Sequence, residues 1–215
     1  MYEVGHVYEI NGVKGLVYKV SPNQRHGMMI SIDCVPAKSA VFCTDKVSFD
    51  TVICQSDNGK ENFAAIEKYI TDNNLSWDNF PVFQWIKENG KGWYLPSIKE
   101  LQEVYEVLYE TSFVNNKIKG QDKKVKAINK EINDNGGTPF GKMMISSTEC
   151  KITNKKNKSK YYVYCISKDS EGSSNVGGLI GLISDVTTAA LNDTYSKIIS
   201  SVTTKASGTR LIMEF

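Results

Sequence analysis

The sequence predicts a single domain over residues 1–215 of the α+β class, with strands at both ends of the chain and helices in the middle. Alternating or β-branched apolar runs occur within residues 6–34 and 142–215, whereas helical periodicity is concentrated in residues 59–135. The 215 residues are 40% hydrophobic and 23% charged, which is enough to bury a substantial core. The elements do not repeat as βαβ units, so we expect mixed or antiparallel sheets.

The N-terminal region is expected to form three strands. Residues 6–10 and 13–20 flank Asn11-Gly12, a pair that favours the tight turn of a β-hairpin. Residues 28–34 alternate, with Met28, Ile30, Ile32 and Cys34 on one face, which predicts a half-buried third strand. One more short strand is expected within residues 47–53, in an otherwise irregular connection.

Helical spacing of apolar residues predicts four helices in the middle of the chain. They cover residues 59–73, 81–89, 97–108 and 121–134. Ser97 and Glu100 have the spacing of a capping box, in which each side chain bonds a first-turn amide, so the third helix should begin there.

The C-terminal region returns to β character at residues 142–150, 161–168 and 209–215. The last of these is expected to pair with the N-terminal hairpin and to bury Ile212. Residues 169–208 are rich in serine, threonine and glycine and are longer than an ordinary connection, so they are interpreted as an insertion.

Residues 92–97 (Gly-Trp-Tyr-Leu-Pro-Ser) with Glu100-Leu101 resemble the G-W-[YR]-L-P-[ST]-x-x-E-L signature of bacterial C-type-lectin-like domains. These include the major-paralogous (FISUMP) type and the C-terminal domain of collagen-like adhesins. Shorter segments resemble other parts of the family's pattern in the same order, namely residues 2–5, 31–33, 79–81 with Trp85, 146–149, and Arg210 before Phe215. The chain departs from that pattern at Ile145, where a tryptophan is usual, and at residues 169–208.

This resemblance implies a C-type-lectin-like fold and an exported or cell-surface protein that binds a glycan or a protein through its loops. No enzymatic activity and no cofactor are expected, because the sequence holds only two histidines and no motif singles out a cysteine. The residues of the signature are themselves expected to be structural, because Trp93 and Leu95 fall on one face of a short strand that Pro96 ends.

The residue content disfavours several other functions. The only imidazoles are His6 and His26, and the five cysteines include no C-x-x-C pair, so no catalytic residue and no metal site is predicted. The E-P-N and W-N-D motifs of calcium-dependent lectins are missing. Arginine occurs only twice among the 26 basic residues, and no apolar run approaches ~20 residues, so neither nucleic-acid binding nor a membrane span is expected.

Ligand contacts are expected on the insertion and on the lysine-rich turn that precedes it, because long connections often carry binding groups. Tyr195 is the leading candidate, since a phenol offers an apolar face and a polar tip. The other candidates are Asp185, Asn192, Asp193, Lys155, Lys156 and Lys158. Two other interpretations of these residues remain open, namely a packed insertion without function and a solvated hairpin. For the whole chain, a structural or assembly domain of a surface complex and a Cys/His enzyme remain alternatives.

Overall fold

The computed structural model describes residues 1–10, 12–49, 51–154, 158–168 and 194–215. Within these ranges it contains four α-helices and two antiparallel four-stranded sheets, which confirms the α+β class. The elements in chain order are β1 (Val7–Ile10), β2 (Val13–Val20), β3 (Gly27–Ser31), α1 (Gly59–Asp72), the 3-10 helix η1 (Trp77–Asn79), α2 (Pro81–Asn89), α3 (Ile98–Tyr109), β4 (Lys117–Lys119), α4 (Asp122–Asp134), β5 (Met144–Thr153), β6 (Ser159–Lys168), β7 (Thr194–Ser201) and β8 (Ile212–Glu214).

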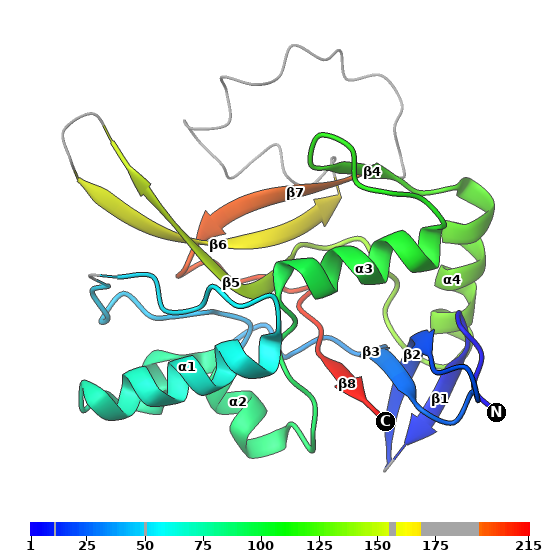
Figure 1. Ribbon diagram of the computed structural model, residues 1–215, viewed down its shortest axis with the longest axis horizontal. Coiled ribbons are helices and arrows are strands. Elements are labelled where there is room, and N and C mark those ends of the chain that lie inside the picture. Colours follow the sequence, from blue (N-terminus) through cyan, green and yellow to red (C-terminus); the bar gives the residue numbers. More distant parts are fainter. Residues whose placement is uncertain (11, 50, 155–157, 169–193) are drawn as a thin grey trace.

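The two sheets have the strand orders β1-β2-β3-β8 and β4-β7-β6-β5. In Figure 1 they lie at opposite sides of the molecule, with α3 between them and with α1 and α2 side by side. The core divides into two clusters. One gathers apolar side chains from α1, α2 and the 35–54 connection, and the other gathers those from α3 and α4. The predicted helices and the β1–β2 hairpin are therefore confirmed, the latter by pairing of Ile10 with Val13.

The pairing of the C-terminal strand differs from the expectation. β8 pairs with β3, and the N-terminal hairpin lies on the far side of β3. Ile212 is fully buried, as predicted. Because β3 is an internal strand covered on both faces, consecutive residues Met29 and Ile30 are both buried, each in a different cluster. The prediction that only one face of this strand is buried was therefore wrong.

Three further differences concern the irregular parts of the chain. Residues 47–49 and 51–53 form no strand. The predicted insertion 169–208 contains β7, which lies between β4 and β6 in the second sheet. β4 itself was not predicted, because three residues are too few to show a period. Residues 169–193 of the predicted insertion lie outside the described residues.

Residues 93–96 connect the two sheets. Tyr94 exchanges both backbone hydrogen bonds with Ile212 of β8, and Pro96 accepts a bond from the amide of Ser147 in β5. Trp93 and Leu95 pack in one core cluster and Tyr94 in the other. The structural role expected for Trp93 and Leu95 is confirmed.

The capping box at the start of α3 also fixes the start of α1. Ser97 Oγ accepts a hydrogen bond from the Glu100 amide and donates one to the carbonyl of Asp57. One carboxylate oxygen of Glu100 accepts bonds from the amides of Ser97 and Gly59, the first residue of α1. The other carboxylate oxygen accepts a bond from the hydroxyl of Tyr94.

We expect Ser97→Ala to lower the free energy of unfolding by about 0.5–2 kcal/mol, because it leaves a first-turn amide and the Asp57 carbonyl without this partner. Chemical denaturation followed by circular dichroism measures the change. Ser76→Ala is the matched control, since Ser76 caps the exposed three-residue helix η1 and its loss should cost less. Equal effects of the two substitutions would contradict the importance of the buried cap.

Candidate functional site

The structure places Tyr195, the leading candidate for a ligand contact, in the core. It lies in β7, is only 1% exposed, and packs against Tyr105 and Tyr109 in tilted ring contacts, with ring centroids 5.0 and 5.4 Å away. Its hydroxyl also accepts a hydrogen bond from the hydroxyl of Tyr109. Tyr195 is buried because β7 is an internal strand and its side chain is on the face of the sheet that packs on α3.

The other predicted contacts do not form a described site. Asp185, Asn192, Asp193, Lys155 and Lys156 lie outside the described residues. Lys158 is exposed beside the turn between β5 and β6, and its amide donates a hydrogen bond to the side chain of Asn154.

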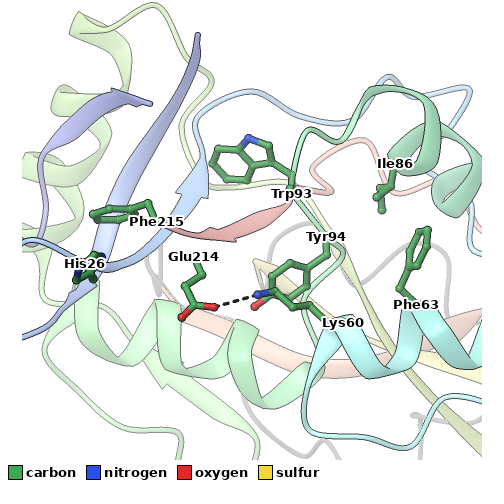
Figure 2. A pocket seen from close by; sticks show the side chains of 9 residues that line it. His26, Lys60, Phe63, Ile86, Trp93, Tyr94, Glu214 and Phe215 are labelled. Atoms are coloured by element: carbon green, nitrogen blue, oxygen red, sulfur yellow. Dashed lines mark hydrogen bonds and ion pairs between the residues drawn. The ribbon is translucent and has the colours of Figure 1, made fainter. Parts of the chain in front are cut away.

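A groove lies at the edge of β8, and we call it the β8–α1 groove. Its volume is about 670 Å³. It lies between the end of β8, the first turns of α1 and the turn that follows α2, as Figure 2 shows. Its lining residues are His26, Lys60, Phe63, Ile86, Gly92, Trp93, Tyr94, Glu214 and Phe215.

The walls of the groove are mostly aromatic. Phe63 and Phe215 are half-buried, whereas Trp93 and Tyr94 are 5% and 6% exposed, so that only a small part of each of these two side chains is accessible. Phe63 is held by Trp77 and Phe83, whose ring centroids lie 6.0 and 5.9 Å away. A ligand would therefore meet a rigid apolar surface.

The mouth of the groove carries opposite charges. Lys60 Nζ lies 3.0 Å from Glu214 Oε2 and 5.3 Å from the centre of the Tyr94 ring. Both charged side chains are well exposed, at 50% and 67%, so their mutual attraction is weak and a ligand can compete for either. Burial, and then the neighbouring Glu100 carboxylate, raise the pKa of the Tyr94 hydroxyl, which therefore stays a neutral hydrogen-bond donor.

A second hollow, of about 580 Å³, lies between α2 and the 36–39 loop. Half-buried Trp85 lines it together with Pro36 and Pro81, and polar side chains including Asp78 and Glu88 surround them.

The three buried cysteines do not provide an activated nucleophile. All five cysteines of the chain are free thiols, and Cys43, Cys54 and Cys165 are buried. Burial raises the pKa of all three, to about 12 for Cys43, with the Glu149 carboxylate adding to the effect at Cys43 and Cys54. The reactive thiolate is therefore disfavoured at these positions.

Glu149 is a buried carboxylate that the sequence analysis did not single out as a site residue. It is 3% exposed, and its Oε2 accepts hydrogen bonds from the amides of Ile53 and Cys54, both 2.9 Å away. Desolvation raises its pKa to about 6, although the two amide bonds oppose the shift. Oε1 is buried and has no hydrogen-bond partner within the described part of the chain. Glu149 therefore attaches the 53–54 segment to β5.

Across the described ranges, no group of three His, Cys, Asp or Glu side chains converges in a way that could hold a metal ion. No helix there has the length and apolar character needed to cross a bilayer. No family model, curated protein or solved structure matches this chain.

Sequence reasoning missed the β8–α1 groove because its lining comes from distant segments, with Lys60 and Glu214 separated by 154 residues. Two features of the sequence lie near the groove in the structure. The 92–97 signature contains Gly92, Trp93 and Tyr94, and the expected return of the C-terminal strand to the N-terminal sheet brings Phe215 beside His26.

Glu149→Gln should remove a pH dependence of stability. The carboxyl of Glu149 binds its proton more tightly in the folded protein than in the unfolded chain. The protonated carboxyl therefore stabilises the fold fully below about pH 4.5, and this stabilisation is lost as the pH rises through about 6. Cys43 and Cys54, which face Glu149, stay neutral over this range. From pH 4.5 to 6.5, the free energy of unfolding of the variant should therefore rise by about 1–2 kcal/mol relative to the wild type.

Urea denaturation of both proteins at several pH values measures this difference. Glu9→Gln, which removes an exposed carboxylate on β1, is the matched control. A difference between Glu149→Gln and the wild type that does not vary with pH would contradict the raised pKa.

Proposed function

We propose that this chain is a non-catalytic recognition or adhesion domain that binds a glycan or protein ligand in the β8–α1 groove. The observation that carries the proposal is the groove itself, about 670 Å³ in volume, with rigid aromatic walls and a charged mouth. Binding sites for small ligands or single side chains fall within roughly 300–1,000 Å³ and combine apolar walls with a few polar groups.

The resemblance to bacterial C-type-lectin-like domains remains part of this proposal. Two features support it. Strands from the two ends of the chain share one sheet, and the segment that carries the signature, residues 92–97, lies where the two sheets are joined. On the same resemblance we propose that the protein is exported or displayed at the cell surface.

The thiols support a non-catalytic role. Raised pKa values at Cys43, Cys54 and Cys165 hold these side chains in the unreactive protonated form. His26, at the rim of the groove, is exposed, and its imidazole can donate a hydrogen bond to a ligand or accept one from it.

The proposal is tested by screening the full chain against a glycan array and a displayed library of random octapeptides. Any ligand is then measured with two matched variants. Phe63→Ala removes a wall of the groove, and Phe49→Ala removes an equally half-buried phenylalanine that packs on the same core cluster outside the groove. We expect Phe63→Ala to weaken binding at least tenfold and Phe49→Ala to change it less than twofold.

Melting curves establish that both variants are folded at the temperature of the binding assay. Equal weakening by the two substitutions would place the ligand elsewhere. Absence of binding in both screens, together with tight self-association, would favour the assembly role instead.

A further inference from the structure

On the side of β8 that faces away from β3, the backbone of Ile212 is hydrogen-bonded to another part of the chain and the backbone of Glu214 is not. In an antiparallel ladder, alternate residues direct their amide and carbonyl groups to opposite sides of the strand. Phe215 exchanges both backbone hydrogen bonds with Gly27 on the β3 side, whereas Ile212 exchanges both with Tyr94 on the outer side. Glu214, two residues after Ile212, therefore also directs its backbone groups outward, away from β3.

The residue that would pair with Glu214 is Gly92, by continuation of the Tyr94–Ile212 register. The chain turns away before it reaches that position, because Lys91 and Gly92 have φ angles of 44° and 93°. No described backbone group bonds to the outward amide or carbonyl of Glu214. Since Gly92 and Glu214 both line the β8–α1 groove, this unpaired edge opens into it.

The side chains around this edge suit a peptide better than a glycan. A sugar needs hydrogen-bond partners for many hydroxyl groups, and the groove wall is instead dominated by Phe63, Ile86 and the accessible parts of Trp93 and Tyr94. The polar side chains at the mouth are few, namely those of Lys60, Glu214 and the rim residue His26. An extended peptide brings its own amide and carbonyl, which are the partners that an open strand edge lacks.

We propose that the β8–α1 groove binds an extended peptide segment, one residue of which pairs with the backbone of Glu214 and so extends the Tyr94–Ile212 bridge. This inference rests on the proposed recognition function and names its ligand class. Opposed residues of an antiparallel pair have their side chains on the same face of the sheet. The ligand residue opposite Glu214 is therefore basic, since its side chain lies beside the Glu214 carboxylate.

The next ligand residue lies opposite Phe215, and its side chain is on the other face of the sheet. Phe215 packs against the cluster that contains Trp93 and Met213. Figure 2 shows the two environments, with Trp93 on one side of β8 and Glu214, Lys60 and Tyr94 on the other. The ligand is therefore a strand in which a basic residue is adjacent to an apolar one.

The test compares two substitutions at Glu214 in the full chain, using peptides selected from the octapeptide library. Glu214→Ala removes the carboxylate and keeps the backbone amide, whereas Glu214→Pro removes both. Proline is tolerated on an edge strand where the missing amide faces outward, and melting curves check that both variants fold. We expect Glu214→Pro to bind at least tenfold more weakly than Glu214→Ala, and Glu214→Ala to lose the preference for a basic residue.

A second measurement does not alter the protein and decides the case if Glu214→Pro fails to fold. Single N-methyl groups are placed in turn on each amide of a selected peptide. One methylated position should abolish binding, because that amide donates to the Glu214 carbonyl. Tolerance of every N-methyl group, or equal binding by folded Glu214→Pro and Glu214→Ala, would overturn the backbone pairing.

The same experiments separate this inference from the proposed function. A glycan that binds and is weakened at least tenfold by Phe63→Ala would overturn the peptide ligand and leave the groove as a recognition site. No binding to either library would overturn both. A self-associating protein whose dimer is lost in Glu214→Pro but kept in Glu214→Ala would identify a second copy of the chain as the source of the peptide.

Discussion

The Glu100 carboxylate is the interaction on which the arrangement of helices, sheets and groove depends. It accepts hydrogen bonds from the first amide of α1, from the cap residue of α3 and from the hydroxyl of Tyr94. Tyr94 in turn is bridged to β8. Because α1 carries Lys60 and Phe63 and β8 carries Glu214, this one side chain determines how the two walls of the groove face each other. Folding and the geometry of the site are therefore coupled through Glu100.

The parts of the fold that could be predicted are those with local causes. Helical periodicity, the Ser97–Glu100 spacing and the Asn11-Gly12 turn each act within a few residues, and the helices and hairpin were placed within one or two residues of their observed ends. Strand pairing depends on contacts far apart in the sequence. The C-terminal strand could thus be recognised, while its partner was assigned to the hairpin instead of β3.

The site could be predicted less well than the fold. Tyr195 was interpreted as a ligand contact because it lies in a long span that was expected to be a connection. The pairing of β7 with β4 and β6 on its two sides places that residue in the core. Serine and threonine are common in strands as well as in loops, so composition did not separate the two. The groove residues could not be recognised from the sequence. Each of them looks like an ordinary core or surface residue, and the groove forms only where four distant segments meet in the fold. The 92–97 signature and the expected return of the C-terminal strand were the two sequence features near it.

The turn at Lys91 and Gly92 explains why the edge of β8 stays open. Both residues have positive φ, a region that costs a non-glycine residue such as Lys91 about 1 kcal/mol or more. A chain that continued straight back from Tyr94 would pair Gly92 with Glu214 and close the edge with two more hydrogen bonds. The fold instead holds a less favourable backbone here, stabilised by the buried Trp93 on one side and the Tyr94–Ile212 bridge on the other. A left-handed residue directly after the C-cap is also a common way for a helix to end, so the termination of α2 at Gly90 sets this turn and leaves open the edge that the proposed peptide would pair with.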